Sequence, residues 1–355
     1  MSESELTWSW PFSKADLTAG LRRYSKDLSV QVTEVIPLKV ADRRPSIGVL
    51  HGLQVTYEGL NGAMTTNIVV KEPRGSTRTG LAGAGRREVG VYQFLAGQMP
   101  MVLPTLIAAS PSGDWLIMEA VPPAKEASEW TSDDYLQAVD ALAQLHDRFW
   151  SLGEDLNAFP WLSRPLTADF SVHVTAAAQS IERIAYRKEP ESIANSPQRM
   201  QLFKILTQEA TFISRALLRS PNTLLHGDYW PGNISVLSPG QQVVFDWQMT
   251  AIGPGILDLV VFIKKSEWWF DTLPLGQDEI IAHYRNSLES SLGMRWEREE
   301  WDELWDHAIM WHFLQEWMDL LAASPDSLLV ASGDQLDRIW LDPVQKAIDR
   351  RIKSV

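Results

Sequence analysis

Residue types suited to phosphate and metal chemistry gather in one segment of the chain, 224–260. Asp228 follows a short apolar run, Asn233 comes five residues later, and Asp246 follows a second apolar run. The turn residues at 238–240 predict that Asp228 and Asp246 stand at the ends of adjacent strands, with Asn233 in the loop between them. Two carboxylates and an amide oxygen suit Mg²⁺, which keeps waters and binds substrate phosphates. A hairpin with Asx turns would explain each residue singly, but not their joint spacing.

The same spacing is found in the catalytic loops of protein kinases. The chain reads HGDYWPGN at 226–233 and Asp-Trp at 246–247, where protein kinases have His-Arg-Asp and Asp-Phe-Gly. Together with a GxxxxDL match at 253–259, this combination resembles the aminoglycoside phosphotransferase and choline kinase group of small-molecule kinases. Upstream, IVVKEP with Lys71 and REVGVYQFL with Glu88 resemble the strand lysine and the helix glutamate of that group.

The resemblance implies a role for each of these side chains. Asp228 would orient and deprotonate the acceptor hydroxyl, while Asn233 and Asp246 would hold Mg²⁺ on the phosphates of ATP or GTP. Lys71 would bind the α- and β-phosphates, and Glu88 would hold Lys71 in place through an ion pair. Because phosphoryl transfer has a loose transition state, positioning and charge neutralisation carry most of the catalysis.

Two less specific segments are expected to add nucleotide contacts. LIMEAV at 116–121 resembles the strand and hinge that hold adenine, so the main chain at Glu119 and Val121 is expected to meet the base. The glycine-rich phosphate loop is matched poorly, by 42–48, in which Ser46 is the residue able to touch the β- and γ-phosphates.

Other residues of the catalytic segment are predicted to support the loop. We expect His226 to pack beneath it, because a magnesium site needs no imidazole, and Asp258 to accept backbone N–H groups from it. Gly227 stands where protein kinases carry the arginine that receives a phosphorylated activation loop, and no A-P-E element follows Asp246. A protein substrate is therefore not expected, and activity should not require phosphorylation of the enzyme.

The elements that must position these residues change in character along the chain. Before residue 121, β-branched runs alternate in strand fashion around one helix; the strands are expected at 30–40, 49–57, 66–71, 105–109 and 115–119 and the helix at 86–95. After a Pro-rich break at 121–127 the period becomes helical; helices are expected at 133–149, with Thr131 or Ser132 as N-cap, at 169–186, at 200–218 and from about 258 onward.

These patterns and the resemblance predict an α+β, two-lobed fold like that of protein kinases. Residues 1–121 would form a small nucleotide-binding lobe, an antiparallel sheet with one helix. Residues 122–355 would form a larger, mainly helical lobe for catalysis and acceptor binding.

Composition limits the partners. The 355 residues include no cysteine, which excludes disulfides, thiolate metal sites and a cysteine nucleophile. A net charge of −13 argues against nucleic-acid binding, which needs a basic face. Segment 1–14 lacks the pattern of a secretion signal, and the apolar run 259–263 is far shorter than the roughly 20 residues that span a membrane. We therefore expect a cytoplasmic protein with no nucleic-acid or membrane partner.

Acidic residues and tryptophans are concentrated after residue 125. Residues 1–125 hold 13 basic and 11 acidic side chains, whereas 126–355 hold 19 basic and 34 acidic ones and 13 of the 16 tryptophans. Carboxylates suit a cationic amine, and tryptophan faces suit cation–π contacts or sugar stacking. The expected acceptor is an amine-bearing sugar or alcohol, such as an aminoglycoside; the residues proposed to bind it are Trp268, Trp301, Trp305 and Glu316.

Three alternatives stay open at this point. The tryptophans can be core residues and the acids a solvated face. The acceptor can be a neutral sugar, a macrolide or a choline-like molecule, handled by a metabolic kinase. The chain can also be an inactive pseudokinase that acts as a nucleotide-binding module, although all five expected functional residues are present.

Overall fold

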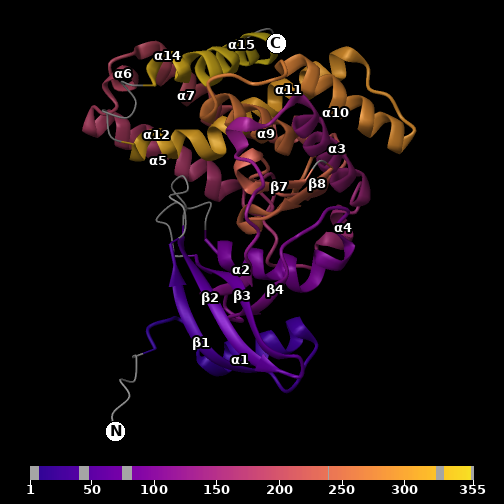
Figure 1. Cartoon of the computed structure of the whole chain (residues 1–355). Coiled ribbons are helices and arrows are strands. Elements are labelled where there is room, and N and C mark those ends of the chain that lie inside the picture. The colour runs from indigo at the N-terminus through magenta and orange to yellow at the C-terminus, as the bar shows by residue number, and fades with distance from the viewer. Residues whose placement is uncertain (1–7, 40–47, 74–81, 239, 325–331, 353–355) are drawn as a thin grey trace.

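A twisted antiparallel sheet and a larger group of helices divide the chain between them, with the sheet at the bottom of Figure 1 and the helices above it. The computed structural model describes residues 8–39, 48–73, 82–238, 240–324 and 332–352. The predicted α+β fold with an N-terminal sheet and a mainly helical remainder is confirmed.

The sheet has five strands in the order β1-β2-β3-β5-β4, each antiparallel to its neighbours. Its strands are β1 (Gln31–Leu38), β2 (Val49–Gly59), β3 (Gly62–Glu72), β4 (Leu106–Ala109) and β5 (Leu116–Glu119). All five lie where alternation of β-branched residues predicts them. β3 is the central strand of the sheet and pairs with β5, with Lys71 opposite Leu116. The predicted phosphate-binding lysine is therefore held on a rigid element.

The prediction of one helix in this part of the chain is wrong, because two helices are present. The expected one begins as α2 (Ala84–Gly90) and continues as a π-helical turn, Val91–Leu95. The other, α1 (Lys14–Ser25), begins with a capping box in which Ser13 and Asp16 exchange hydrogen bonds. It packs beside β4 and buries leucines one turn apart, Leu17 and Leu21, in an apolar cluster that otherwise comes from the sheet.

The helices after the linker form the larger part of the molecule. They are α3 (Ser132–Arg148), α4 (Gly153–Leu156), α5 (Phe170–Arg187), α6 (Glu191–Ala194), α7 (Pro197–Gln208), α8 (Ala210–Leu217), α9 (Ile256–Trp269), α10 (Gln277–Leu292), α11 (Arg298–His312), α12 (Met318–Ala323), α14 (Gly333–Leu336) and α15 (Asp342–Arg351), with π-helical segments Phe313–Trp317 and Asp337–Leu341. The single helix expected at 200–218 is in fact two, because the chain leaves helical geometry at Glu209.

Two small sheets are embedded among these helices and carry the catalytic segment. One pairs β6 (Thr223–Leu225) with β9 (Ala251–Gly253), and the other pairs β7 (Ile234–Ser238) with β8 (Gln241–Val244). Asp228 therefore follows a strand of one sheet and Asp246 a strand of the other, so the expectation that their strands are adjacent is wrong. The two segments are joined instead by the imidazole of His226, whose Nε2 lies 3.1 Å from the Phe245 carbonyl oxygen.

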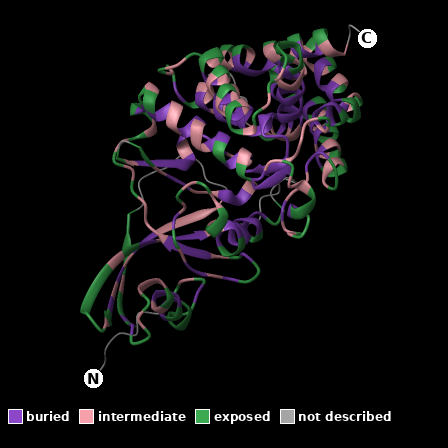
Figure 2. Ribbon diagram, turned by 90° about the vertical axis from the view of Figure 1, so that its right-hand side faces the viewer, coloured by how far each residue is buried: buried purple, intermediate pink, exposed green. Residues whose placement is uncertain are grey.

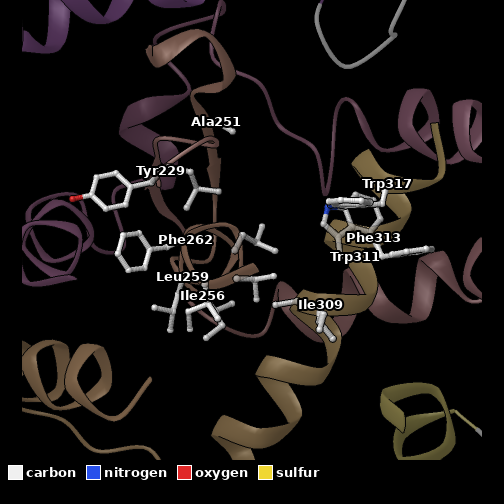
Figure 3. Packing of buried hydrophobic residues seen from close by; sticks show 14 of the residues in the cluster. Tyr229, Ala251, Ile256, Leu259, Phe262, Ile309, Trp311, Phe313 and Trp317 are labelled. Carbon is white, nitrogen blue, oxygen red and sulfur yellow. The ribbon is translucent and has the colours of Figure 1, made fainter. Parts of the chain in front are cut away.

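The interior of the helical part is rich in aromatic residues, and Figure 2 shows buried residues concentrated in the middle of this part and exposed ones toward its outside. Tyr229, from the catalytic segment, packs against Phe262 of α9 with ring centroids 5.8 Å apart (Figure 3). The Tyr229 hydroxyl donates to the Ala138 carbonyl of α3, so the catalytic segment is anchored in the core. Among the described residues, no helix is long and apolar enough to cross a membrane.

The start of α3 gives a test of this fold. Thr131 is its N-cap: its side chain accepts a hydrogen bond from the Asp134 N–H, and the Asp134 carboxylate accepts one from the Thr131 N–H at 2.7 Å. We expect Thr131→Ala to lower the free energy of unfolding by about 1 kcal/mol, measured by urea denaturation. Thr131→Ser, which keeps the cap hydroxyl, should stay near the wild-type value; equal losses in both variants would contradict a capping role.

Candidate active site

A buried ammonium stands between two carboxylates at the junction of sheet and helices. Lys71 Nζ lies 2.7 Å from Glu88 Oε2 and 2.6 Å from Asp246 Oδ1, and the Lys71 side chain is 3% exposed. The predicted ion pair between Lys71 and Glu88 is thus present. Burial by itself would lower the pKa of Lys71, but attraction to Asp246 and Glu88 outweighs that effect and raises the pKa. Lys71 is therefore a permanent cation in a position to meet an anionic ligand.

Asp228 and Asn233 face each other in the loop that follows β6. Asn233 Nδ2 donates to the Asp228 carbonyl at 2.9 Å and to its Oδ2 at 3.0 Å. The Asn233 side chain is held by a short 3-10 turn, Pro231–Asn233, which begins at a proline. Burial raises the pKa of the Asp228 carboxyl to about 6, although Lys265 beside it favours the charged form. A carboxylate with a raised pKa is a better proton acceptor than an exposed one.

The loop around Asp228 is fixed by hydrogen bonds from behind. Asp258, near the start of α9, accepts the backbone N–H of His226 at 2.7 Å and that of Gly227 at 2.8 Å. Both predictions for the support of the loop are confirmed, because His226 is fully buried against Trp247 with ring centroids 4.4 Å apart. The arrangement aims the Asp228 side chain away from the core and toward Lys265.

Gly227 owes its identity to the backbone of this loop. Its φ is +81°, and a Cβ placed there would lie 2.1 Å from the Met249 carbonyl oxygen. Any larger residue, including the arginine of protein kinases, would need the loop and the segment after Asp246 to separate.

The donor set near Asp228 fits a magnesium ion. Asn233 turns its Nδ2 toward Asp228, and no hydrogen bond to its Oδ1 occurs among the described residues. Asp246 uses one oxygen, Oδ1, for Lys71. One carboxylate and one amide oxygen leave most of the coordination sphere to waters and phosphates, which is how proteins usually hold Mg²⁺. Among the described residues, no cluster of three or more His, Asp or Glu side chains able to hold a metal is found.

The segment after β5 joins the sheet to the helices and is tied to both. The Glu119 carboxylate accepts from the Thr105 N–H at 2.9 Å and from the Tyr24 hydroxyl at 3.3 Å, so this side chain is used within the sheet lobe. The Val121 carbonyl accepts from the Ser235 hydroxyl at 3.0 Å. Contact of a nucleotide base with the main chain at Glu119 and Val121 stays a prediction. Ser46 lies outside the described residues.

The four residues predicted to bind the acceptor do not come together. Glu316 lies at the site: its Oε1 is 3.4 Å from Lys265 Nζ, which contacts Asp228. Trp268, at the end of α9, packs edge-on against Trp317, the residue that follows Glu316 in the chain, with ring centroids 4.7 Å apart.

Trp301 and Trp305 lie on α11, away from that position. Trp301 is buried against Tyr284 and Trp296. The rise of a helix puts it about 20 Å along the axis from Glu316. Trp305 is half-buried one turn further along and packs against the core. Placing Trp301 in an acceptor pocket was wrong, because helical spacing defines a face but leaves the distance along it open.

Two basic residues of the site were not singled out from the sequence. Lys265 of α9 places its Nζ 2.5 Å from Asp228 Oδ1. Arg87 of α2 donates to the Gln248 carbonyl at 2.8 Å, linking the helix of Glu88 to the segment after Asp246. The second of two adjacent lysines in an apolar helix was a detectable signal for Lys265, because a lysine on such a helix needs a partner.

A sheet-borne lysine paired with a helix glutamate, facing an aspartate–asparagine loop and a second aspartate, defines a kinase-like phosphotransferase. The comparisons agree: the chain belongs to the phosphotransferase enzyme family, whose model matches residues 56–304. It is therefore an enzyme that phosphorylates a hydroxyl group of a small molecule, with a nucleotide as co-substrate. No curated protein matches the chain significantly.

Solved structures share the fold at low sequence identity. The streptomycin–ATP ternary complex of APH(2")-IIa is 12% identical, with a TM-score of 0.53, and the match covers 94% of this chain and 99% of that one. The amicoumacin kinase hAmiN in complex with AMP-PNP, Ca²⁺ and Ami is 16% identical, with a TM-score of 0.52, and the match covers 92% of each chain. The similarity extends over the helical part that the sequence motifs did not cover.

Gly227 provides a test of the loop geometry, with Gly240 as its matched control. Gly240 has a similar φ of +79°, but nothing lies within 4 Å of a Cβ placed there. Gly240→Ala should cost only the left-handed conformation, about 1–2 kcal/mol. Gly227→Ala adds a clash with backbone and should lose at least about 1 kcal/mol more, together with most phosphate transfer. Equal melting temperatures for the two variants would contradict this account.

Proposed function

We propose that the protein transfers the γ-phosphate of ATP or GTP to a hydroxyl of a small, amine-bearing sugar or alcohol, in a Mg²⁺-dependent reaction in the cytoplasm. The observation that carries the proposal is the arrangement of two charge clusters. One places Lys71 between Glu88 and Asp246, and the other places Asp228 between Asn233 and Lys265. The first suits a nucleotide triphosphate and the second suits an attacking hydroxyl.

Each residue of the site has a defined task in this proposal. Asp228 orients the acceptor hydroxyl and takes its proton as the oxygen attacks the γ-phosphorus in line with the leaving β-phosphate oxygen. Lys71, held by Glu88, binds the α- and β-phosphates and offsets their charge. Asn233 and Asp246 would hold Mg²⁺, which when bound supplies charge neutralisation at the phosphates. The main chain at Glu119 and Val121 holds the base, and Ser46 is proposed to reach the β- and γ-phosphates.

The amine-bearing acceptor is supported by charge and by the structural relatives. The chain carries a net charge of −13, concentrated after residue 125, and negative potential attracts cationic molecules. The two relatives described above are complexes with streptomycin and with Ami. A neutral acceptor is the second candidate, because Glu316 already pairs with Lys265. Trp268 beside Trp317 offers a ring face to either acceptor.

Replacement of Asp228 tests the catalytic assignment. Asp228→Asn keeps the shape of the side chain but cannot accept a proton, so transfer should fall by about 10²–10⁴-fold. Nucleotide binding, measured as a thermal shift with ATP or GTP and Mg²⁺, should be retained. The acceptor panel is aminoglycosides, choline, amino sugars, neutral sugars and macrolides, assayed by nucleotide turnover. Turnover confined to neutral sugars or macrolides would contradict an amine-bearing acceptor. Nucleotide binding without any turnover would favour a pseudokinase.

Magnesium dependence tests the metal assignment. Asp246→Asn removes a charged oxygen donor, so the Mg²⁺ concentration for half-maximal turnover should rise at least about tenfold. The exposed Asp278 of α10 provides the control, and Asp278→Asn should titrate like the wild type. An unchanged Mg²⁺ requirement in Asp246→Asn would assign the metal to other residues.

A further inference from the structure

The acceptor side of the site already contains a primary ammonium. Lys265 Nζ lies 2.5 Å from Asp228 Oδ1 and 3.4 Å from Glu316 Oε1, so it bridges the two carboxylates. The three side chains are 15%, 14% and 16% exposed, in the order Lys265, Asp228, Glu316. They are mostly buried but each keeps some exposed surface, as a group that borders a substrate must.

The remaining oxygens of both carboxylates also have polar neighbours. Asp228 Oδ2 accepts from Asn233 at 3.0 Å. Glu316 Oε2 lies 3.6 Å from His312 Nε2, one helical turn earlier. Two carboxylates that converge on one ammonium are the arrangement that would bind an amine of a substrate. Here the chain supplies that amine itself.

A second cation at this place would be disfavoured. Burial by itself would lower the pKa of Lys265, but attraction to Asp228 and Glu316 outweighs that effect and raises the pKa, so Lys265 stays charged at neutral pH. A substrate ammonium bound by the same carboxylates would lie within about 4 Å of Lys265 Nζ, where like charges repel strongly in a partly buried site.

We propose that Lys265 fills an ammonium subsite from within the chain, so that the carbon framework next to the phosphorylated hydroxyl carries no amine. This inference rests on the proposed function and narrows its acceptor. Any amines of the acceptor lie away from the reacting hydroxyl. Lys265 is thereby a specificity-determining residue.

The neighbouring lysine separates this role from a merely structural one. Lys264 is also buried on α9, but its Nζ bonds Glu267 at 2.9 Å and Gln277 at 2.7 Å. Truncation of either lysine should lower stability. Only truncation of Lys265 should leave an empty space between two carboxylates, those of Asp228 and Glu316.

Binding of n-propylammonium tests the subsite directly, because this ion replaces the atoms that Lys265→Ala removes. Calorimetry should show at least tenfold tighter binding to Lys265→Ala than to the wild type or to Lys264→Ala. The double variant Lys265→Ala/Glu316→Gln should lose that gain, and 1-propanol should not bind. Equal affinity of the wild type and Lys265→Ala would overturn the proposal. If Lys265→Ala fails to fold, Lys265→Ser with the same probe decides in the same way.

Turnover provides a second arm that also separates the two proposals. The assay compares two acceptors that differ only in carrying an amine or a hydroxyl next to the phosphorylated position, and NMR of the product identifies that position. The wild type should have at least tenfold higher kcat/KM for the acceptor with the hydroxyl. Lys265→Ala should reduce or reverse this ratio through KM, and Lys264→Ala should keep it. An unchanged ratio in Lys265→Ala would contradict the inference. Failure of every acceptor in the wild type would reject the proposed function, while the binding result would still decide the subsite.

Discussion

The buried ammonium of Lys71 is the group through which the parts of this enzyme are joined. Lys71 comes from the sheet, Glu88 from α2 and Asp246 from the segment after β8, so one charge cluster connects three elements. Loss of Lys71 would leave two carboxylates without their counterion, which costs about 3–5 kcal/mol. Arg87 adds a second link between α2 and the segment after Asp246 through the Gln248 carbonyl. Under the proposed function, the junction of sheet and helices and the binding of phosphate thus depend on the same few atoms.

A second network sets the catalytic loop from the opposite side. Asp258 holds the loop by two backbone N–H groups and also lies 3.3 Å from His146 Nε2 of α3. His146 Nδ1 is in turn 2.6 Å from the Tyr284 hydroxyl of α10. Three helices therefore determine where Asp228 stands. Asp228 can tolerate an unfavourable, buried position because the loop that carries it has little freedom to relax.

Strands and catalytic motif were predictable because their signals are local: alternation, turn residues and fixed spacing. Helix α1 was not predicted, although Leu17 and Leu21 lie one turn apart, because strand-like alternation is the stronger pattern in the residues that follow it. Lys265 was missed for a different reason, since its partner Asp228 is 37 positions away and the contact arises only when α9 packs behind the loop. The distance of Trp301 from the acceptor side was not predictable, because helical spacing gives the direction in which a side chain points but not its position along the helix. Long-range packing, which no local pattern encodes, decides the acceptor side.

The contact between Lys71 and Asp246 has a consequence for how a nucleotide enters. At 2.6 Å, each group serves as the counterion of the other. A nucleotide that arrives with its divalent cation brings an anion for Lys71 and a cation for Asp246 in one event. The entry then exchanges counterions with little change in net charge, whereas a bare nucleotide would leave Asp246 without a counterion and a bare cation would be repelled by Lys71. In the resting site, Lys71 and Asp246 therefore stay paired until an anion and a cation replace both partners together.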